Sequence, residues 1–172
     1  TYKLYSNSGR WTFNGGIRAN YWSFNKEWLI SPRLSTTYVP DWNADFDFRL
    51  AVGLYHQAPF YKEIRTETTD KYGNTSLLLN KNIKAQRSLH VVLGADYYFR
   101  LWNRPFKFTA EAYYKPGDRV NPYYVDNVRI RYLGTNNAVA QTAGIDLKLF
   151  GEFVPGTDSW ISFSWMYSKE NL

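Results

Sequence analysis

The sequence predicts an all-β protein, an antiparallel transmembrane β-barrel wall of about seven to eight strands taken from a larger barrel. Three observations favour this fold class. Apolar and polar residues alternate over long runs, the aromatic content is high, and the connections between the runs alternate between short and long. Together these features are typical of strands that cross a membrane with one face in lipid and the other in water.

The aromatic content is the most unusual feature of the composition. Of the 172 residues 19% are aromatic, with 15 Tyr, 11 Phe and 7 Trp. Tyr and Trp suit a membrane interface because each combines an apolar ring with a polar tip. An aromatic-rich soluble β domain, such as a sugar-binding module, would explain the composition equally well. Composition alone therefore leaves both classes open.

Charge and cysteine content exclude several classes of protein. The chain has no cysteine, so it has neither a disulfide framework nor a thiolate metal site. The net charge of +6 comes from interleaved charges without a block of one sign, which argues against a nucleic-acid partner. No apolar run approaches the roughly 18 residues of a membrane helix. Residues 1–20 lack a signal peptide and an initiating Met, so we expect a processed or excerpted segment.

Seven runs alternate with period two, and several exceed the ordinary strand length of about 5–6 residues. A tilted membrane strand needs about 9–11 residues. The runs cover residues 11–21, 28–38, 46–55, 88–99, 106–114, 142–153 and 161–168, with a further strand end at 2–5. No segment shows a convincing 3.6-residue period, so the sequence predicts essentially no helix.

The connections are sorted by length. Short turns rich in Gly, Pro, Asn or Asp are predicted at 6–9, 40–44, 101–105 and 154–159. The intervening connections are 23–27, 58–86 and 116–140, of which the last two are the longest in the chain. This alternation is expected when every second turn faces the periplasm and the others face outside. A soluble sandwich has no reason to sort its loops in this way.

The two faces of the predicted strands differ in character. One carries Ile, Leu, Val and Ala between aromatic residues at both strand ends, as in the aromatic girdles of a membrane barrel. Its short-turn girdle is predicted to include Trp11, Phe106 and Trp160. The other face is polar, and its candidate lumen-facing residues are Arg33, Arg49, His90, Asp96, Glu111 and Asp146. These side chains could line a substrate path or a plug, although a ladder of cross-strand ion pairs is the favoured interpretation.

No catalytic constellation emerges from the sequence. His56 and His90 are the only histidines, and no spacing suggests a metal site or a phosphate-binding loop. We therefore expect no enzymatic activity and no cofactor. The connection 58–86 carries aromatic residues beside charged ones, and in a surface loop such residues could contact a ligand or a partner protein. The candidates for this contact are Phe60, Tyr61, Arg65 and Tyr72. A loop that merely folds over its neighbours is an equally good interpretation.

Several segments, in order, resemble one known family, the TonB-dependent outer-membrane receptors. The resembling segments are the Pro-Arg strand at 31–40, the strand 48–55 leading into Gln-Ala-Pro-Phe at 57–60, Asn-Ala at 137–138 followed by Gly-Ile-Asp-Leu at 144–147, and the hairpin 153–160. The hairpin is similar to that of the subgroup with a carboxypeptidase-regulatory-like N-terminal domain. Each motif is weak alone, whereas the ordered set covers nearly the whole chain.

The resemblance implies a 22-stranded barrel with an N-terminal plug, in the outer membrane of a Gram-negative bacterium. It also implies energised uptake of a siderophore, cobalamin, a peptide or a glycan. Residues 1–172 would be a partial barrel domain without plug, TonB-contacting box or final strand. The expected partners are outer-membrane lipid, the TonB complex through that plug, and a surface lipoprotein or other outer-membrane subunits.

Three alternatives accompany this interpretation. The chain is long enough for a complete eight-stranded barrel. The last strand, however, would run outward and leave Leu172 on the extracellular side, whereas a closed bacterial barrel returns both termini to the periplasm. A receptor-like barrel could serve as a structural subunit of an outer-membrane complex without transport. A soluble β-sandwich binding module is the alternative from a different class. No family site residue can be transferred to this chain.

Overall fold

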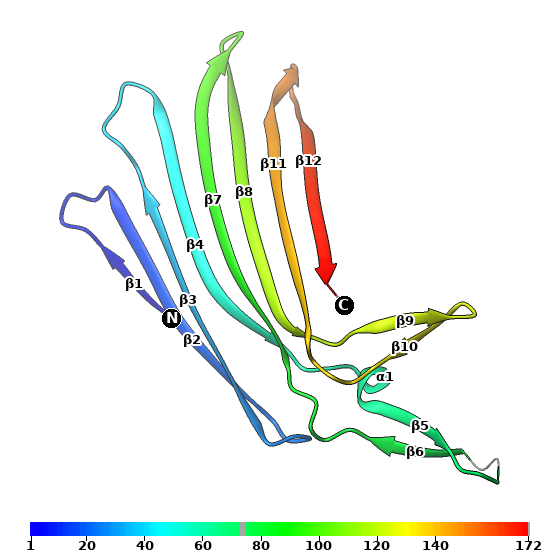
Figure 1. Cartoon of the computed structure of the whole chain (residues 1–172). Helices are drawn as coiled ribbons and strands as arrows, with labels where there is room; N and C mark the ends of the chain where they lie inside the picture. Colours follow the sequence, from blue (N-terminus) through cyan, green and yellow to red (C-terminus); the bar gives the residue numbers. More distant parts are fainter. Residues whose placement is uncertain (73–74, 172) are drawn as a thin grey trace.

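The structure is a computed structural model and describes residues 1–72 and 75–171. Its main feature is an open antiparallel sheet of eight strands, each hydrogen-bonded to its neighbours in the order β1-β2-β3-β4-β7-β8-β11-β12 (Figure 1). The strands are β1 (Tyr2–Tyr5), β2 (Trp11–Trp22), β3 (Glu27–Tyr38), β4 (Asp45–Gln57), β7 (Gln86–Leu101), β8 (Arg104–Val120), β11 (Ala138–Val154) and β12 (Thr157–Asn171). The all-β, antiparallel prediction is confirmed, and every predicted run coincides with one of these strands.

The strands are longer than the alternating runs, reaching 17 residues in β8 and β11. Backbone pairing continues through polar residues in which no alternation is visible. For example, Gln141 of β11 pairs with Pro116 of β8. The turns predicted at 101–105 and 154–159 are correspondingly tighter than expected. Residues 102–103 connect β7 to β8, and residues 155–156 connect β11 to β12. In the first, Trp102 and Asn103 both have positive φ (51° and 62°), the backbone geometry that matches the twist of a hairpin.

The two longest connections lie at the same end of the sheet, as predicted, but the sorting by length is incomplete, because 23–26 at that end is shorter than 39–44 at the other. In Figure 1 the connections at 6–10, 39–44, 102–103 and 155–156 lie at the upper end, and those at 23–26, 58–85 and 121–137 lie at the lower end. The lower connections contain regular structure that the sequence did not predict. They hold the single-turn helix α1 (Tyr61–Ile64), the hairpin of β5 (Arg65–Thr69) and β6 (Thr75–Leu79), and the hairpin of β9 (Tyr123–Asp126) and β10 (Arg129–Tyr132). Strands of four or five residues are too short to establish a period.

The register confirms that the sheet has one apolar and one polar face. One cross-strand row joins Leu50, Leu93, Ala112, Ile145 and Trp165. The adjacent row joins Arg49, Gly94, Glu111, Asp146 and Ser164. Successive side chains of a strand point to opposite faces, so these two rows face opposite ways across five strands.

The placement of Trp160 is a correction to the sequence prediction. Its cross-strand partner is Phe150, and the Nζ of Lys148 lies 5.5 Å from the centroid of its ring. Trp160 therefore lies on the polar face and does not belong to the apolar girdle. The prediction used its position at the end of a strand, whereas its parity relative to Ile161 decides its face.

Neither face of the sheet is covered by a second layer within the described residues, because the principal contacts of each sheet strand are with its neighbours in the sheet. Side chains on the apolar face are consequently exposed, with Ile17 at 76%, Leu93 at 58% and Ile161 at 64%. Burying such a side chain contributes about 1.5–3 kcal/mol. The apolar face therefore needs an apolar medium or a further layer to be stable.

Candidate functional site

Aromatic residues form a belt along the apolar face at the short-turn end. The ring centroids of Phe46 and Tyr97 are 4.5 Å apart, and those of Tyr97 and Phe99 are 5.1 Å apart. Phe106 continues the belt and contacts Phe153 edge-on at 5.2 Å. These contacts link β4, β7, β8 and β11 into one band.

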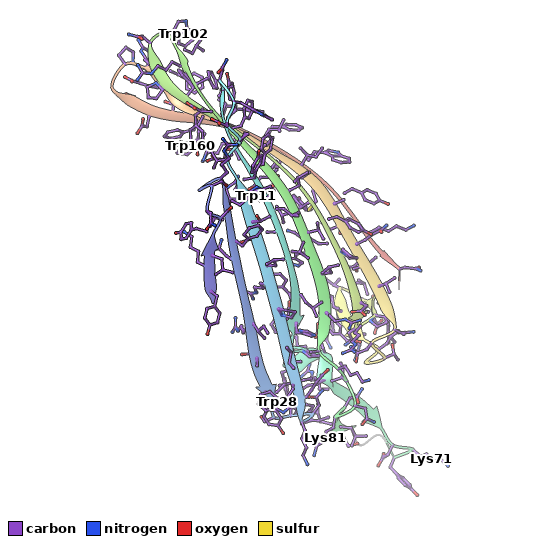
Figure 2. All side chains as sticks on the ribbon, turned by 90° about the vertical axis from the view of Figure 1, so that its left-hand side faces the viewer. Trp11, Trp28, Lys71, Lys81, Trp102 and Trp160 are labelled. Atoms are coloured by element: carbon purple, nitrogen blue, oxygen red, sulfur yellow. The ribbon has the colours of Figure 1, made fainter. Side chains whose placement is uncertain are left out.

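A smaller aromatic group marks the opposite end of the sheet. There the rings of Tyr21 and Trp28 lie 5.2 Å apart on β2 and β3. Figure 2 places Trp11 and Trp102 toward one end of the molecule and Trp28 toward the other. Aliphatic side chains occupy the length of the strands between the two groups, as the sequence predicts.

The polar face carries a charge cluster around Asp96 on β7. The carboxylate of Asp96 is almost fully buried, at 4% exposure, and accepts hydrogen bonds from Arg49 Nη2 at 3.3 Å and Thr109 Oγ1 at 2.6 Å. Its other oxygen lies 3.2 Å from Lys107 Nζ. Arg49 also donates to Glu111 at 3.1 Å. This Asp96 cluster joins β4, β7 and β8, as the favoured ladder of cross-strand ion pairs predicts.

The six predicted lumen-facing residues separate into three groups. Arg49, Asp96 and Glu111 meet in the Asp96 cluster, whereas Arg33 and His90 lie elsewhere on the same face. Asp146 is the direct cross-strand partner of Glu111 and has no ion pair within 4 Å among the described residues. Ion pairing therefore accounts for half of the predicted set.

Removing the charge of Asp96 should weaken the fold. Asp96→Asn leaves Arg49 and Lys107 without their shared anion, and we expect the free energy of unfolding to fall by about 1–3 kcal/mol. Glu111→Gln is the matched control, because its side chain is 38% exposed and its pair with Arg49 should contribute less than about 1 kcal/mol. Urea unfolding of refolded protein measures both. Equal effects of the two substitutions would contradict the central role of Asp96.

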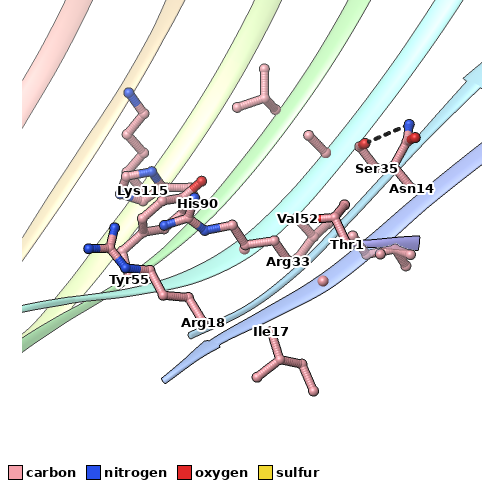
Figure 3. A pocket seen from close by; sticks show the side chains of 16 residues that line it. Thr1, Asn14, Ile17, Arg18, Arg33, Ser35, Val52, Tyr55, His90 and Lys115 are labelled. Atoms are coloured by element: carbon pink, nitrogen blue, oxygen red, sulfur yellow. Dashed lines mark hydrogen bonds between the residues drawn. The ribbon is translucent and has the colours of Figure 1, made fainter. Parts of the chain in front are cut away.

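A hollow of 590 Å³ opens on the polar face beside this cluster. Its charged and aromatic lining comes from Arg18, Arg33, Tyr55, His90 and Lys115 (Figure 3). The guanidinium carbon of Arg33 lies 4.4 Å from the centroid of the Tyr55 ring, and Tyr55 stacks on His90 at 4.2 Å.

A glycine makes room for this arrangement. A Cβ at Gly53 would lie 2.9 Å from Tyr55 Cε2 and 3.2 Å from Arg33 Cγ, so Gly53 allows both side chains to cross the strand. Tyr55 and Lys115 were not among the predicted site residues. The sequence pattern that could have indicated Tyr55 is its position two residues after Gly53, because the two residues then lie on the same face of the strand.

The long connections are tied to one another by carboxylate and asparagine side chains. Glu27 accepts hydrogen bonds from Asn25 Nδ2, from the backbone N–H of Ala85 and from Arg119 Nη1. Asn136 donates to the carbonyls of Lys84 and Arg119 at 3.1 and 2.9 Å. The three connections at this end therefore form one loop cluster, which encloses the buried side chains of Ile83, Ala85 and Ala138.

A second set of hydrogen bonds continues the loop cluster through Asn80, Asn121 and Gly134. Asn80 donates to the Gly134 carbonyl at 2.9 Å, and Asn121 accepts from the Gly134 N–H at 2.7 Å. Burial raises the pKa of Glu63, against the opposing effect of a hydrogen bond from the Phe60 backbone N–H. Asparagines scattered through long connections have no spacing that predicts their pairing, so sequence reasoning missed this cluster.

The loop contact candidates lie on the outer surface of the loop cluster. Phe60, Tyr61 and Tyr72 are 64%, 55% and 90% exposed, and the Arg65 guanidinium carbon lies 5.8 Å from the centroid of the Tyr61 ring. Phe60, Tyr61 and Arg65 come from α1 and the residues that flank it, whereas Tyr72 lies near the tip of the β5–β6 hairpin. Their role in contacting a ligand or partner stays a prediction.

The described residues contain no group of three or more His, Asp or Glu side chains placed to hold a metal ion. Within the same part of the chain, no helix combines the length and the apolar character that are needed to cross a bilayer. No protein-family model matches the chain, and no curated protein matches it significantly.

Proposed function

We propose that residues 1–172 form part of the wall of a transmembrane β-barrel in the outer membrane of a Gram-negative bacterium. We further propose that this barrel belongs to a TonB-dependent receptor, which takes up a scarce nutrient. The observation that carries the proposal is the exposed apolar face, which runs across eight neighbouring strands and is flanked by aromatic residues at both ends. Lipid would cover the aliphatic band, and the aromatic groups would lie at the two interfaces.

The other face fits a hydrated interior. The Asp96 cluster and the cationic hollow both lie there, and charges are costly against hydrocarbon but tolerated in a water-filled lumen. A soluble sandwich would instead bury the apolar face under a second sheet. Sheet strands other than β1 contain 12–17 residues, which exceeds the strand length usual in a sandwich of about 5–6.

The sheet needs further strands in this proposal. Within the described residues β12 pairs only with β11, so its 15 residues present one unpaired edge. An unsatisfied backbone group in hydrocarbon costs several kcal/mol, and closed barrels avoid this cost because they have no edge. We therefore place more strands beside β1 and β12, as in the large barrels of the family that the sequence resembles.

Membrane placement can be tested residue by residue, because the chain has no native cysteine. Single cysteines replace Leu50 and Leu147 on the apolar face, and Ala51 and Lys148 on the polar face, and each receives a nitroxide spin label. In liposomes, labels at 50 and 147 should collide mainly with oxygen, which concentrates in lipid. Labels at 51 and 148 should collide mainly with a water-soluble nickel chelate.

Two further observations accompany that measurement. The protein should require detergent for solubility and should migrate differently on a gel before and after heating. Equal access of the nickel chelate to all four positions, with full solubility after detergent removal, would establish a soluble binding module instead.

The receptor role is tested separately in cells. A strain without this gene and a strain without TonB are compared on limiting iron chelates, cobalamin, peptides and glycans. We expect both strains to fail on the same nutrient class. A gene deletion that disturbs the outer membrane without any uptake defect would support the structural-subunit role.

A further inference from the structure

We propose that the polar-face hollow is a binding site for a small organic anion that carries carboxylate or phosphate groups. The inference depends on the charges and shape of the hollow and goes beyond the proposed nutrient uptake. It does not require the sheet to lie in a membrane, so it can fail while the membrane proposal stands.

The first argument is an imbalance of charge. Arg18, Arg33 and Lys115 line the hollow, and none of its 16 lining residues is Asp or Glu. None of these three cations has a carboxylate oxygen within 4 Å among the described residues. The hollow therefore concentrates positive charge that the described chain does not neutralise.

The second argument is the contrast with neighbouring cations on the same sheet. Arg49 and Lys107 meet Asp96, Arg87 pairs with Asp118, and Arg119 pairs with Glu27. The hollow thus gathers three cations that have no carboxylate partner among the described residues, although Arg87 with its partner Asp118 lies close to Lys115. Opposite charges on adjacent strands normally stabilise a sheet, so a region with cations alone favours an external anion.

The third argument is preorganisation. Arg33 is held over the Tyr55 ring and Lys115 lies 4.4 Å from the centroid of the Tyr113 ring, so aromatic faces orient both cations without neutralising them. In Figure 3 Arg33 lies over the Tyr55 ring of the Tyr55–His90 stack, and Arg18 and Lys115 line the same hollow, with the amine end of Lys115 leading away from the stack. A guanidinium is suited to bidentate recognition of a carboxylate or phosphate.

The volume limits the class of ligand. At 590 Å³ the hollow has the size of an ordinary small-molecule site and is too small for a folded partner. Several separated cations suit a ligand with more than one anionic group. Citrate and inorganic phosphate are therefore suitable probes, with uncharged sucrose as the comparison.

Isothermal titration calorimetry of the full-length protein in non-ionic detergent at low salt tests the proposal. Citrate or phosphate should bind, sucrose should not, and added sodium chloride should weaken binding. Arg33→Gln and Lys115→Gln should each raise the Kd about tenfold, because each removes one charged contact. Lys148→Gln is the control, because it removes the same charge from the same face outside the hollow.

The unfolding of each variant on heating, followed by gel mobility, verifies that it is folded. Failure of both citrate and phosphate to bind would overturn the proposal. Equal weakening by Lys148→Gln would also overturn it, since binding would then reflect net charge alone. Binding of a hexaglutamate peptide without binding of either small anion would assign the hollow to an acidic polypeptide and overturn the proposal as well.

Discussion

Leu93→Arg is expected to lower the free energy of unfolding in lipid by about 2–4 kcal/mol, the cost of an arginine near the centre of a lipid-facing barrel surface. Leu93 is 58% exposed and lies in the apolar row between Leu50 and Ala112. The charge would have to enter hydrocarbon or distort the surrounding lipid. Guanidinium-induced unfolding from phospholipid vesicles measures the change.

Val92→Arg is the matched control for this substitution. Val92 is the adjacent residue of β7, and it lines the polar-face hollow, where a new arginine would meet water. We expect its effect on stability in lipid to be much smaller than that of Leu93→Arg. Should Val92→Arg be the more damaging change, lipid would contact the opposite face and the proposed orientation would be wrong.

Gly144→Ala is expected to cost about 1–3 kcal/mol through overpacking. A Cβ at this position would collide with the hydroxyl of Tyr113 and would lie 2.6 Å from the backbone carbonyl oxygen of Trp165. The Tyr113 side chain could turn away, but the carbonyl belongs to the ladder between β11 and β12 and cannot move without breaking it. The effect should appear as a lower midpoint of denaturant unfolding.

Gly15→Ala separates this collision from the general effect of replacing a strand glycine. The nearest atom to a Cβ at Gly15 is Leu34 Cδ1 at 3.9 Å, an ordinary contact. Alanine there should be neutral or stabilising by up to about 1 kcal/mol, because glycine loses more conformational freedom on folding. If both substitutions destabilised equally, crowding by Tyr113 and Trp165 would not be the cause.

Much of the sheet could be predicted because alternation is a local property. The runs around Leu50 and Leu93 define their faces without knowledge of any partner, and neighbouring strands then align like with like. Trp160 shows the limit of this reasoning. Its position at a strand end suggested the aromatic girdle, whereas its parity places it over Lys148 on the polar face.

The candidate site was predictable only in part. That Arg49, Asp96 and Glu111 share a face follows from parity, but their meeting depends on the register between β4, β7 and β8. The loop cluster was not foreseen, because Asn121 and Gly134 lie 13 residues apart within one connection and Asn80 reaches them from another. Such contacts leave no local pattern.

By itself the sequence determined the strand content, the positions of the two longest connections and the division into apolar and polar faces. Each of these depends on neighbouring residues along one strand or on the length of one segment. The tertiary structure alone decided which cations are neutralised and which surround an open hollow. Strand register, set by the whole sheet, brings Arg49 to Asp96 and leaves Arg33 and Lys115 without a carboxylate partner among the described residues. Such cross-strand distances cannot be read from a single strand.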